Sequence, residues 1–227
     1  MTMDEIILQA KNIFKSYSNG EKNLTVLGDL SLTAKQNEII TITGQSGSGK
    51  STLLNILSTL DQPDSGIVEI DGQNIINLDK NRIAKIRNEK IGFVFQFHHL
   101  LSEFTALENV LMPVWIKDSI QNKKEEAIQL FDKLNLTSKV HYFPNQLSGG
   151  ERTRIALLRG IINKPKILFA DEPTGNLDKK NAEILVELLD EINIDFNQTI
   201  IITTHNPQIA EIGHSKYELE NGLLKNK

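Results

Sequence analysis

Cysteine is absent from the sequence. Its absence excludes disulfide bonds, thiolate zinc sites and thiol nucleophiles, and it suits a reducing compartment. No apolar run approaches the ~18 residues that span a bilayer, so we expect no direct membrane insertion. The first residues, Met1-Thr2-Met3-Asp4-Glu5, are acidic and unlike a signal peptide. We therefore expect a cytosolic protein that reaches a membrane only through a partner.

A basic excess is also missing, because the formal net charge is −4 at pH 7. Proteins that bind the nucleic-acid backbone usually carry a basic footprint, so we expect no nucleic acid as partner, although a local basic patch stays open. The hydrophobic content of 39% is ordinary and argues against disorder. The 227 residues suit one large α/β domain, or a core with a small appended lobe.

A glycine-rich loop is the clearest pattern present: Gly44-Gln45-Ser46-Gly47-Ser48-Gly49-Lys50-Ser51 matches G-x-x-x-x-G-K-[ST]. A strand is predicted before it, from Glu38 to Thr43, and a helix after it, to about Ser58. The glycines let backbone N–H groups turn inward around a polyphosphate, Lys50 reaches the outer phosphates, and Ser51 supplies a hydroxyl for Mg²⁺. A turn that binds nothing is the alternative, but the flanking elements favour a nucleotide site.

Two carboxylates follow a second apolar strand, Lys166 to Ala170. Side chains at the carboxyl ends of parallel strands lie where ligands bind in open α/β sheets. We expect Asp171 to hold Mg²⁺ beside Ser51, and Glu172 to orient and polarise the attacking water. Solvated carboxylates after a strand are common, so this assignment depends on the glycine-rich loop upstream.

A second glycine-containing loop, Gln146-Leu147-Ser148-Gly149-Gly150-Glu151-Arg152, opens a predicted helix. Such a helix end attracts anions. One nucleotide does not easily use two distant loops, which suggests two copies arranged head to tail, each completing the other's site. The alternative is a turn in which Ser148 only caps the helix.

The remaining pattern alternates strands and helices around a helical middle. Apolar residues at helical spacing, Ala127, Leu130, Phe131 and Leu134, indicate a core-facing stripe. Further strands are predicted at Ile6 to Lys11, Leu24 to Thr33 (after a turn at Ser18-Asn19-Gly20), Ile67 to Ile70, Ile91 to Phe95 and Thr199 to Thr203, with helices around Asp79 to Asn88 and Lys180 to Ile192, a helical segment from Phe97 to about Ile162, and a hairpin at Tyr217 to Leu224.

Three aromatic or imidazole side chains have two interpretations each. Tyr17 is either a half-buried residue at a strand end or a ring that stacks on adenine. The pair His98-His99 suggests a metal, but adjacent residues do not face one another on a helix or strand, and no third ligand of matching spacing is present. A metal site there is therefore not predicted.

The stretch Leu147-Ser148-Gly149-Gly150-Glu151 resembles the signature loop of the ATP-binding-cassette (ABC) ATPases. The other motifs of that family occur in the expected order over essentially the whole chain. The resemblance implies a P-loop NTPase (RecA-like) parallel-sheet core with an antiparallel β subdomain and an inserted α-helical subdomain. It divides the single domain 1–227 into a core of about 1–96 and 163–227 and a helical subdomain of about 97–162.

The same resemblance implies roles for individual residues. Tyr17 matches the adenine-stacking aromatic, Gln96 the glutamine that links the Mg²⁺ site to the helical lobe, and His205 the switch histidine at the γ-phosphate. Glu172, His205 and Gln96 are then catalytic, and Ser51, Gln96 and Asp171 hold the metal. The further residues implied to contact ATP, its own or that of the other subunit, are Thr52, Ser148, Gly149, Gly150, Glu151 and Asp178.

A narrower resemblance, to the lipoprotein-releasing branch of the family, rests on Gln96 to Leu101 and Glu103 to Val110. It implies a homodimer that closes on two ATP at the cytoplasmic face of the inner membrane, docks membrane permease subunits near residues 97–115, and drives release of lipoproteins. The segment Gly175 to Asp178 is shared with macrolide-exporter and FtsE-type relatives, so these stay as alternatives.

Three positions depart from the family pattern. Asn37 stands where glycine is usual, and asparagine tolerates the same backbone region. Asn206 replaces an aspartate, and Thr153 replaces a glutamine after the signature. Two other classes fit less well: a DNA-repair ATPase would need a coiled-coil insertion or a basic face, and a nucleotide kinase or GTPase does not explain Ser148 to Gly150.

Overall fold

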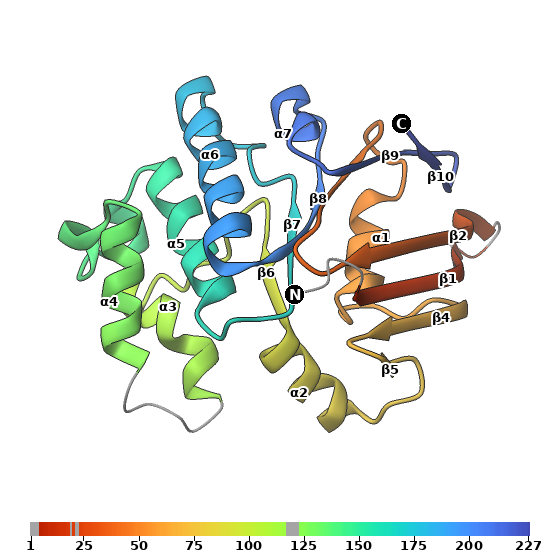
Figure 1. Cartoon of the computed structure of the whole chain (residues 1–227), viewed down its shortest axis with the longest axis horizontal. Helices are drawn as coiled ribbons and strands as arrows, with labels where there is room; N and C mark the ends of the chain where they lie inside the picture. Colours follow the sequence, from red (N-terminus) through yellow and green to blue (C-terminus); the bar gives the residue numbers. More distant parts are fainter. Residues whose placement is uncertain (1–4, 19, 21–22, 117–122) are drawn as a thin grey trace.

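Figure 1 shows the computed structural model, which describes residues 5–18, 20, 23–116 and 123–227. Met1 to Asp4 of the acidic stretch, and Asn19 of the predicted turn, lie outside these residues. Among the helices described, none combines the length and the apolar character that crossing a bilayer demands.

A six-stranded sheet forms the centre of the protein, with strand order β10-β9-β3-β8-β7-β6. Neighbouring strands from β9 to β6 run parallel, and β10 returns antiparallel to β9. The carboxyl ends of the parallel strands therefore share one edge. The strands are β3 (Ile39–Thr43), β6 (Ile91–Val94), β7 (Ile167–Asp171), β8 (Thr199–Thr203), β9 (Ser215–Glu220) and β10 (Leu223–Asn226).

A second, antiparallel sheet has the order β2-β1-β4-β5 and lies on one side of the central sheet (Figure 1). Its strands are β1 (Ile6–Ser18), β2 (Asn23–Lys35), β4 (Ser65–Ile70) and β5 (Gln73–Asn74). The helices α3 (Ala106–Trp115), α4 (Lys123–Lys133) and α5 (Gly149–Ile161) gather on the opposite side of the molecule. The central sheet thus lies between a β subdomain and a helical lobe.

The helices begin at residues that suit helix starts. Asp79 accepts hydrogen bonds from two backbone N–H groups of α2, and Thr105 forms a capping box with Glu108 at the start of α3. The helices are α1 (Lys50–Leu57), α2 (Lys80–Lys90), α3 (Ala106–Trp115), α4 (Lys123–Lys133), α5 (Gly149–Ile161), α6 (Lys179–Phe196) and α7 (Pro207–Glu211), with 3-10 turns η2 (Thr137–Lys139) and η3 (Pro144–Gln146).

The core divides into two clusters because successive strand residues face opposite sides of the sheet. In β7, Ile167 and Phe169 pack with the antiparallel sheet, whereas Leu168 and Ala170 pack with the helical lobe. All four are fully buried. The near-continuous apolar strands are therefore those of a sheet that is covered on both faces.

The predicted fold class is confirmed, and most predicted elements lie where the patterns place them. The stripe of α4 is buried, and the predicted hairpin is β9–β10. The helix predicted for Lys180 to Ile192 extends to Phe196 and ends at Asn197, whose φ of 50° closes it. Helix α7 was not predicted, because five residues are too short to show a helical period.

Close packing of α5 on β6 gives a testable consequence for stability. A Cβ atom at Gly92 would lie 2.2 Å from the carbonyl oxygen of Gly160 and 2.9 Å from Leu168 Cδ1. We expect Gly92→Ala to force the helix away from the sheet and to lower the free energy of unfolding by about 1–3 kcal/mol in urea titrations. Gly28→Ala is the matched control, because its nearest neighbour would be Thr25 Cγ2 at 4.0 Å. Equal stability of the two variants would contradict the packing argument.

Candidate functional site

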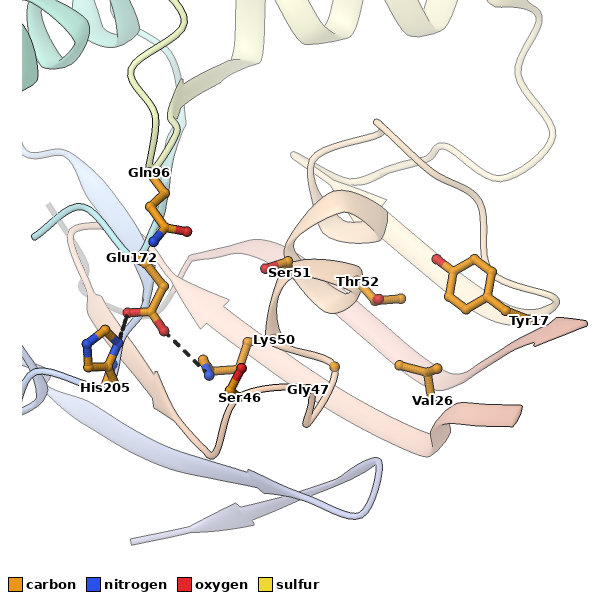
Figure 2. Close-up of a pocket in the computed structure, with 11 residues that line it drawn as sticks. Tyr17, Val26, Ser46, Gly47, Lys50, Ser51, Thr52, Gln96, Glu172 and His205 are labelled. Carbon is orange, nitrogen blue, oxygen red and sulfur yellow. Dashed lines mark hydrogen bonds and ion pairs between the residues drawn. The ribbon is translucent and has the colours of Figure 1, made fainter. Parts of the chain in front are cut away.

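A cavity of about 620 Å³ opens between the edge of the central sheet and the antiparallel sheet (Figure 2). Its lining comes from strands β1 and β2, the glycine-rich loop, the start of α1, and the residues just after β6, β7 and β8. The lining residues are Tyr17, Val26, Ser46, Gly47, Gly49, Lys50, Ser51, Thr52, Gln96, Glu172 and His205. The fold therefore brings together most of the residues that the sequence assigns to one nucleotide site.

The glycine-rich loop turns tightly between β3 and α1. Gly49 caps the helix with φ 102°, and a Cβ atom there would meet Val26 Cγ1 at 2.9 Å. Only glycine combines this backbone conformation with this close approach to β2. The start of α1 therefore faces the cavity with free backbone N–H groups, which favour an anion.

Lys50 brings a buried positive charge to the loop. The residue is 7% exposed, and its Nζ donates to the carbonyl oxygens of Gly44 at 2.8 Å and Gln45 at 3.1 Å. The same Nζ lies 3.4 Å from Glu172 Oε1. The ammonium group and the helix start together make this end of the cavity attractive to phosphate.

Glu172 follows β7 in a left-handed conformation, with φ 45°. Its backbone N–H donates to the Thr203 carbonyl at 2.9 Å, which ties the turn to β8. Its carboxylate lies between Lys50 and His205 (Figure 2), with Oε2 2.7 Å from His205 Nδ1 and 3.1 Å from the His205 backbone N. The carboxylate is thus fixed at the edge of the cavity, where it can orient a water molecule.

The residues predicted for Mg²⁺ come from three elements. Ser51 and Gln96 line the cavity, whereas Asp171 ends β7 and does not appear among the lining residues described. Asp171 Oδ1 accepts a hydrogen bond from Thr203 Oγ1 at 2.6 Å. Hydroxyl, amide and carboxylate oxygens are the donor set that Mg²⁺ prefers, so these residues fit the ion by their chemistry.

Tyr17 lies at the other end of the cavity from Glu172 and His205 (Figure 2). It is 45% exposed, and its hydroxyl donates to Asp61 Oδ2 at 2.9 Å. Val26, on the adjacent strand β2, also lines this end. Val26 could not be predicted as a lining residue, because an apolar strand residue is most simply part of a core.

The second loop does not join this cavity: Ser148, Gly149 and Gly150 are outside its described lining. Ser148 caps α5, accepting from the Glu151 N–H at 3.3 Å, while Glu151 Oε2 accepts from the Ser148 N–H at 2.7 Å. Burial opposes the effect, but these bonds and Lys139, 3.3 Å away, lower the pKa of Glu151. The helix-cap interpretation of Ser148 therefore holds, and an anion-binding role stays a prediction.

Asp178 caps helix α6, whose start lies beside the start of α5. Its Oδ1 accepts from the Asn181 N–H at 2.8 Å at the start of α6. A Cβ atom at Gly150 would lie 2.2 Å from Asn181 Oδ1, so the two helix starts are in close contact. Asp178 and the second loop thus form one surface.

The histidine pair lies in a turn, with φ 60° at His98 and φ 47° at His99. The Arg159 guanidinium donates to both carbonyl oxygens, at 2.6 and 2.7 Å, and holds this unusual backbone. His98 Nε2 lies 2.6 Å from Thr153 Oγ1 inside the protein, and burial, followed by Arg152 and Arg159, lowers the pKa of His98 to about 4. Within the described part of the chain, no three His, Cys, Asp or Glu side chains are grouped for a metal.

The three departures from the expected pattern have local explanations. Asn37 adopts φ 61°, as predicted for a residue in place of glycine. Asn206 caps α7 by accepting from the Gln208 N–H at 2.8 Å, a role that asparagine fills as well as aspartate. Thr153 is the hydrogen-bond partner of His98. Arg159 is a residue that the sequence analysis missed, because a basic residue on a helix gives no sign of what it binds.

Comparison with known proteins gives consistent matches. The family model described as ABC transporter matches residues 27–175. The lipoprotein-releasing system ATP-binding protein LolD of Buchnera aphidicola is 43% identical over 98% of both chains, and LolD of Shewanella oneidensis is 42% identical over 98% of this chain and 97% of its own. Two solved dimers of the ABC transporter cassette MJ0796, one bound to ADP and Pi, have a TM-score of 0.90 at 37% and 36% identity, covering 97% of this chain and 98% of theirs.

The buried contact of His98 with Thr153 can be tested without disturbing the cavity. Thr153→Val keeps the shape but leaves the His98 ring nitrogen unpaired, so we expect a loss of about 1–2 kcal/mol in the free energy of unfolding. Thr153→Ser keeps the hydroxyl and should retain most of that stability. Urea denaturation followed by circular dichroism measures both, and a valine variant as stable as the serine variant would show that the contact contributes nothing.

Proposed function

The chain belongs to the ABC transporter family of ATP-binding proteins, and on this premise we propose that it is the ATP-hydrolysing subunit of a lipoprotein-releasing system. Members of this family bind and hydrolyse ATP, so the chain is an ABC-type ATPase. The observation that carries the ATP-hydrolysing role is the meeting of Lys50, Glu172 and His205 at one end of the cavity.

ATP occupies this cavity with its phosphates against the glycine-rich loop and its base toward Tyr17. The buried Ser48 hydroxyl oxygen has no hydrogen-bond partner among the described residues, which supports a ligand inside the loop. Lys50 turns from the loop carbonyls and Glu172 toward the outer phosphates. Glu172 is then free to accept a proton from the attacking water, and His205 holds the γ-phosphate side of the site.

We assign Mg²⁺ to Ser51, Gln96 and Asp171, whose oxygens suit the ion. When bound, it neutralises charge on the phosphates. Gln96 directly precedes the helical lobe, which begins at residue 97, and Asn176 Nδ2 donates to its carbonyl oxygen at 2.9 Å. Gln96 thus lines the nucleotide cavity, while its backbone is tied to the segment that precedes Asp178.

Two copies arranged head to tail complete two such sites. Ser148, Gly149, Gly150 and Glu151 of one copy cover the phosphates bound by the other, and Asp178 contacts the facing subunit. The support is geometric, because this loop lies outside its own chain's cavity although its helix start suits an anion. ATP binding closes the dimer, and hydrolysis reopens it.

Membrane permease subunits dock on the segment 97–115 of the helical lobe. We propose that this lobe spans about residues 97–162. Another cavity, of about 450 Å³, lies beside this segment, and its lining includes the apolar residues Phe95, Met112 and Pro113. Phe97 is 68% exposed and Ile116 73%, and beside the apolar lining of this cavity these side chains suit a partner surface. Docking there places the chain at the cytoplasmic face of the inner membrane.

The cargo assignment follows from the lipoprotein-releasing relatives. Purification of the chain from membranes in detergent should recover integral-membrane subunits, and reconstitution of that complex should release lipoproteins from vesicles in an ATP-dependent manner. Recovery of partners that move a different cargo, or that move none, would contradict this assignment while leaving the ATPase assignment intact.

Replacing the carboxylate of Glu172 tests its role in ATP hydrolysis. Glu172→Gln keeps the phosphate and metal contacts, so we expect ATP binding to survive, a nucleotide-bound dimer to accumulate, and turnover to fall by about 10²–10⁴. Phosphate release and gel filtration measure these effects. Glu187→Gln, the same change at an exposed position of α6, is the control. Turnover at the wild-type rate in Glu172→Gln would show that another group activates the water.

Blocking the second loop tests the head-to-tail arrangement. Ser148→Arg fills the surface that meets the other copy, so we expect ATPase activity to fall to background while a single chain still binds nucleotide. Loss of the cap should lower stability by about 1 kcal/mol, which thermal unfolding checks. Ser138→Arg adds the same side chain at an exposed position of the same lobe. If Ser148→Arg abolished binding by the single chain, Ser148 would belong to its own chain's site.

A further inference from the structure

Strand β1 carries a buried lysine where the alternation of the strand calls for an apolar side chain. Ile13, Lys15 and Tyr17 share one face, and Ile13 is fully buried. Lys15 is only 9% exposed. A lysine is almost never this buried unless it is paired, so its partners indicate what the position is for.

The ammonium group of Lys15 is surrounded by acceptors that follow helix α1. Its Nζ donates to Asp61 Oδ1 at 3.1 Å and to the Gln62 carbonyl at 2.6 Å, and it lies 3.9 Å from Asp64 Oδ1. Burial opposes the effect, but the Gln62 N–H, the Tyr17 hydroxyl and Lys15 together lower the pKa of Asp61. Asp61 is therefore a carboxylate at neutral pH.

Both members of this pair also contact Tyr17. Lys15 Nζ lies over the Tyr17 ring, 5.1 Å from its centroid, and Asp61 Oδ2 accepts the Tyr17 hydroxyl proton at 2.9 Å. The described lining of the nucleotide cavity includes Tyr17 but neither Lys15 nor Asp61. The Tyr17 ring therefore lines the cavity, whereas Lys15 and Asp61 contact the ring from outside the cavity lining.

Helix α1 links this support to the phosphate end of the site. The glycine-rich loop precedes the helix, and Asp61 follows it after a short turn. Eight residues of α-helix span about 12 Å. One helix therefore has the phosphate loop at its start and, just beyond its end, the carboxylate that binds the tyrosine hydroxyl. Its length sets the spacing between the phosphate loop and Tyr17, which lie apart in the cavity (Figure 2).

We propose that Lys15 and Asp61 are positioning residues that hold the Tyr17 ring as the platform for the nucleobase, an inference that rests on the proposed role of Tyr17 in ATP binding. Lys15 covers the ring face turned away from the cavity by a cation–π contact, and Asp61 fixes the ring's rotation through the hydroxyl. The ring is then oriented before ATP arrives, so less ordering has to accompany binding.

A purely structural role for the pair makes a different prediction. Asp64 accepts from the Ser16 N–H at 2.7 Å, and the Asp64 N–H donates to the Phe14 carbonyl, so the 61–64 turn is already attached to β1. If Lys15 only adds to that attachment, its removal should weaken binding of any polyphosphate through a distorted loop. If it positions the ring, only ligands that carry a base should be affected.

The test compares the affinities for ATP and for inorganic triphosphate by calorimetry, in the wild type, Lys15→Met, Tyr17→Phe and Tyr17→Ala. We expect Lys15→Met and Tyr17→Phe to bind ATP about three- to tenfold more weakly, with triphosphate affinity unchanged. In the Tyr17→Ala background, Lys15→Met should have no further effect on ATP, because the ring it acts through is gone. Lys11→Met, at an exposed position of the same strand, should match the wild type.

Two results overturn the proposal in distinguishable ways. If Tyr17→Ala bound ATP as the wild type does, the role of Tyr17 itself would be wrong. If Tyr17→Ala weakened ATP binding but Lys15→Met weakened ATP and triphosphate equally, or acted equally in both backgrounds, the pair would act on the fold alone. Tyr17→Phe removes only the hydroxyl that binds Asp61, so we expect it to fold. It therefore still tests the positioning of the ring if Lys15→Met fails to fold.

Discussion

The parallel register of four neighbouring strands is the constraint on which the rest of the site depends. Thr203 pairs with both Ile42 and Asp171, and Val94 pairs with Ala170. The glycine-rich loop, Glu172, His205 and Gln96 therefore leave the sheet at nearly the same level, although they are far apart in the sequence. A slip of one strand would separate Lys50 from Glu172, since side-chain direction alternates with every residue.

The antiparallel sheet and the helical lobe add further residues to those at the carboxyl edge of the central sheet. The antiparallel sheet supplies Tyr17 and Val26, which line the cavity beyond the glycine-rich loop. The helical lobe carries Ser148 away from the cavity of its own chain, on a helix whose start is capped by Glu151. The proposed head-to-tail dimer accounts for two anion-attracting loops in a single chain, because in it each chain provides the glycine-rich loop of one site and the Ser148 loop of the other.

The sequence predicted those features that depend on local chemistry. The glycine-rich loop, the carboxylates after β7 and the buried stripe of α4 follow from spacing alone, and the structure brings Lys50 and Glu172 to one cavity as that spacing predicts. Gln96 lines the same cavity, but only the family resemblance implied its place there. Contacts between distant segments could not be predicted in the same way. The support of Tyr17 by Asp61, and of the histidine turn by Arg159, depends on how sheets and helices pack, and a charged residue gives no sign of its partner.

The central claim, that each ATP lies between two chains, is tested most directly by mixing two defective variants. One chain carries Lys50→Ala and the other Ser148→Arg, and both carry Glu172→Gln so that bound ATP is kept. In a head-to-tail dimer of the two, one site combines both defects and the other has none. The account predicts that the dimer fraction of the mixture retains labelled ATP through gel filtration, although the dimer fraction of neither parent does. A mixture that retains no more ATP in its dimer fraction than the parents would contradict a site shared between chains.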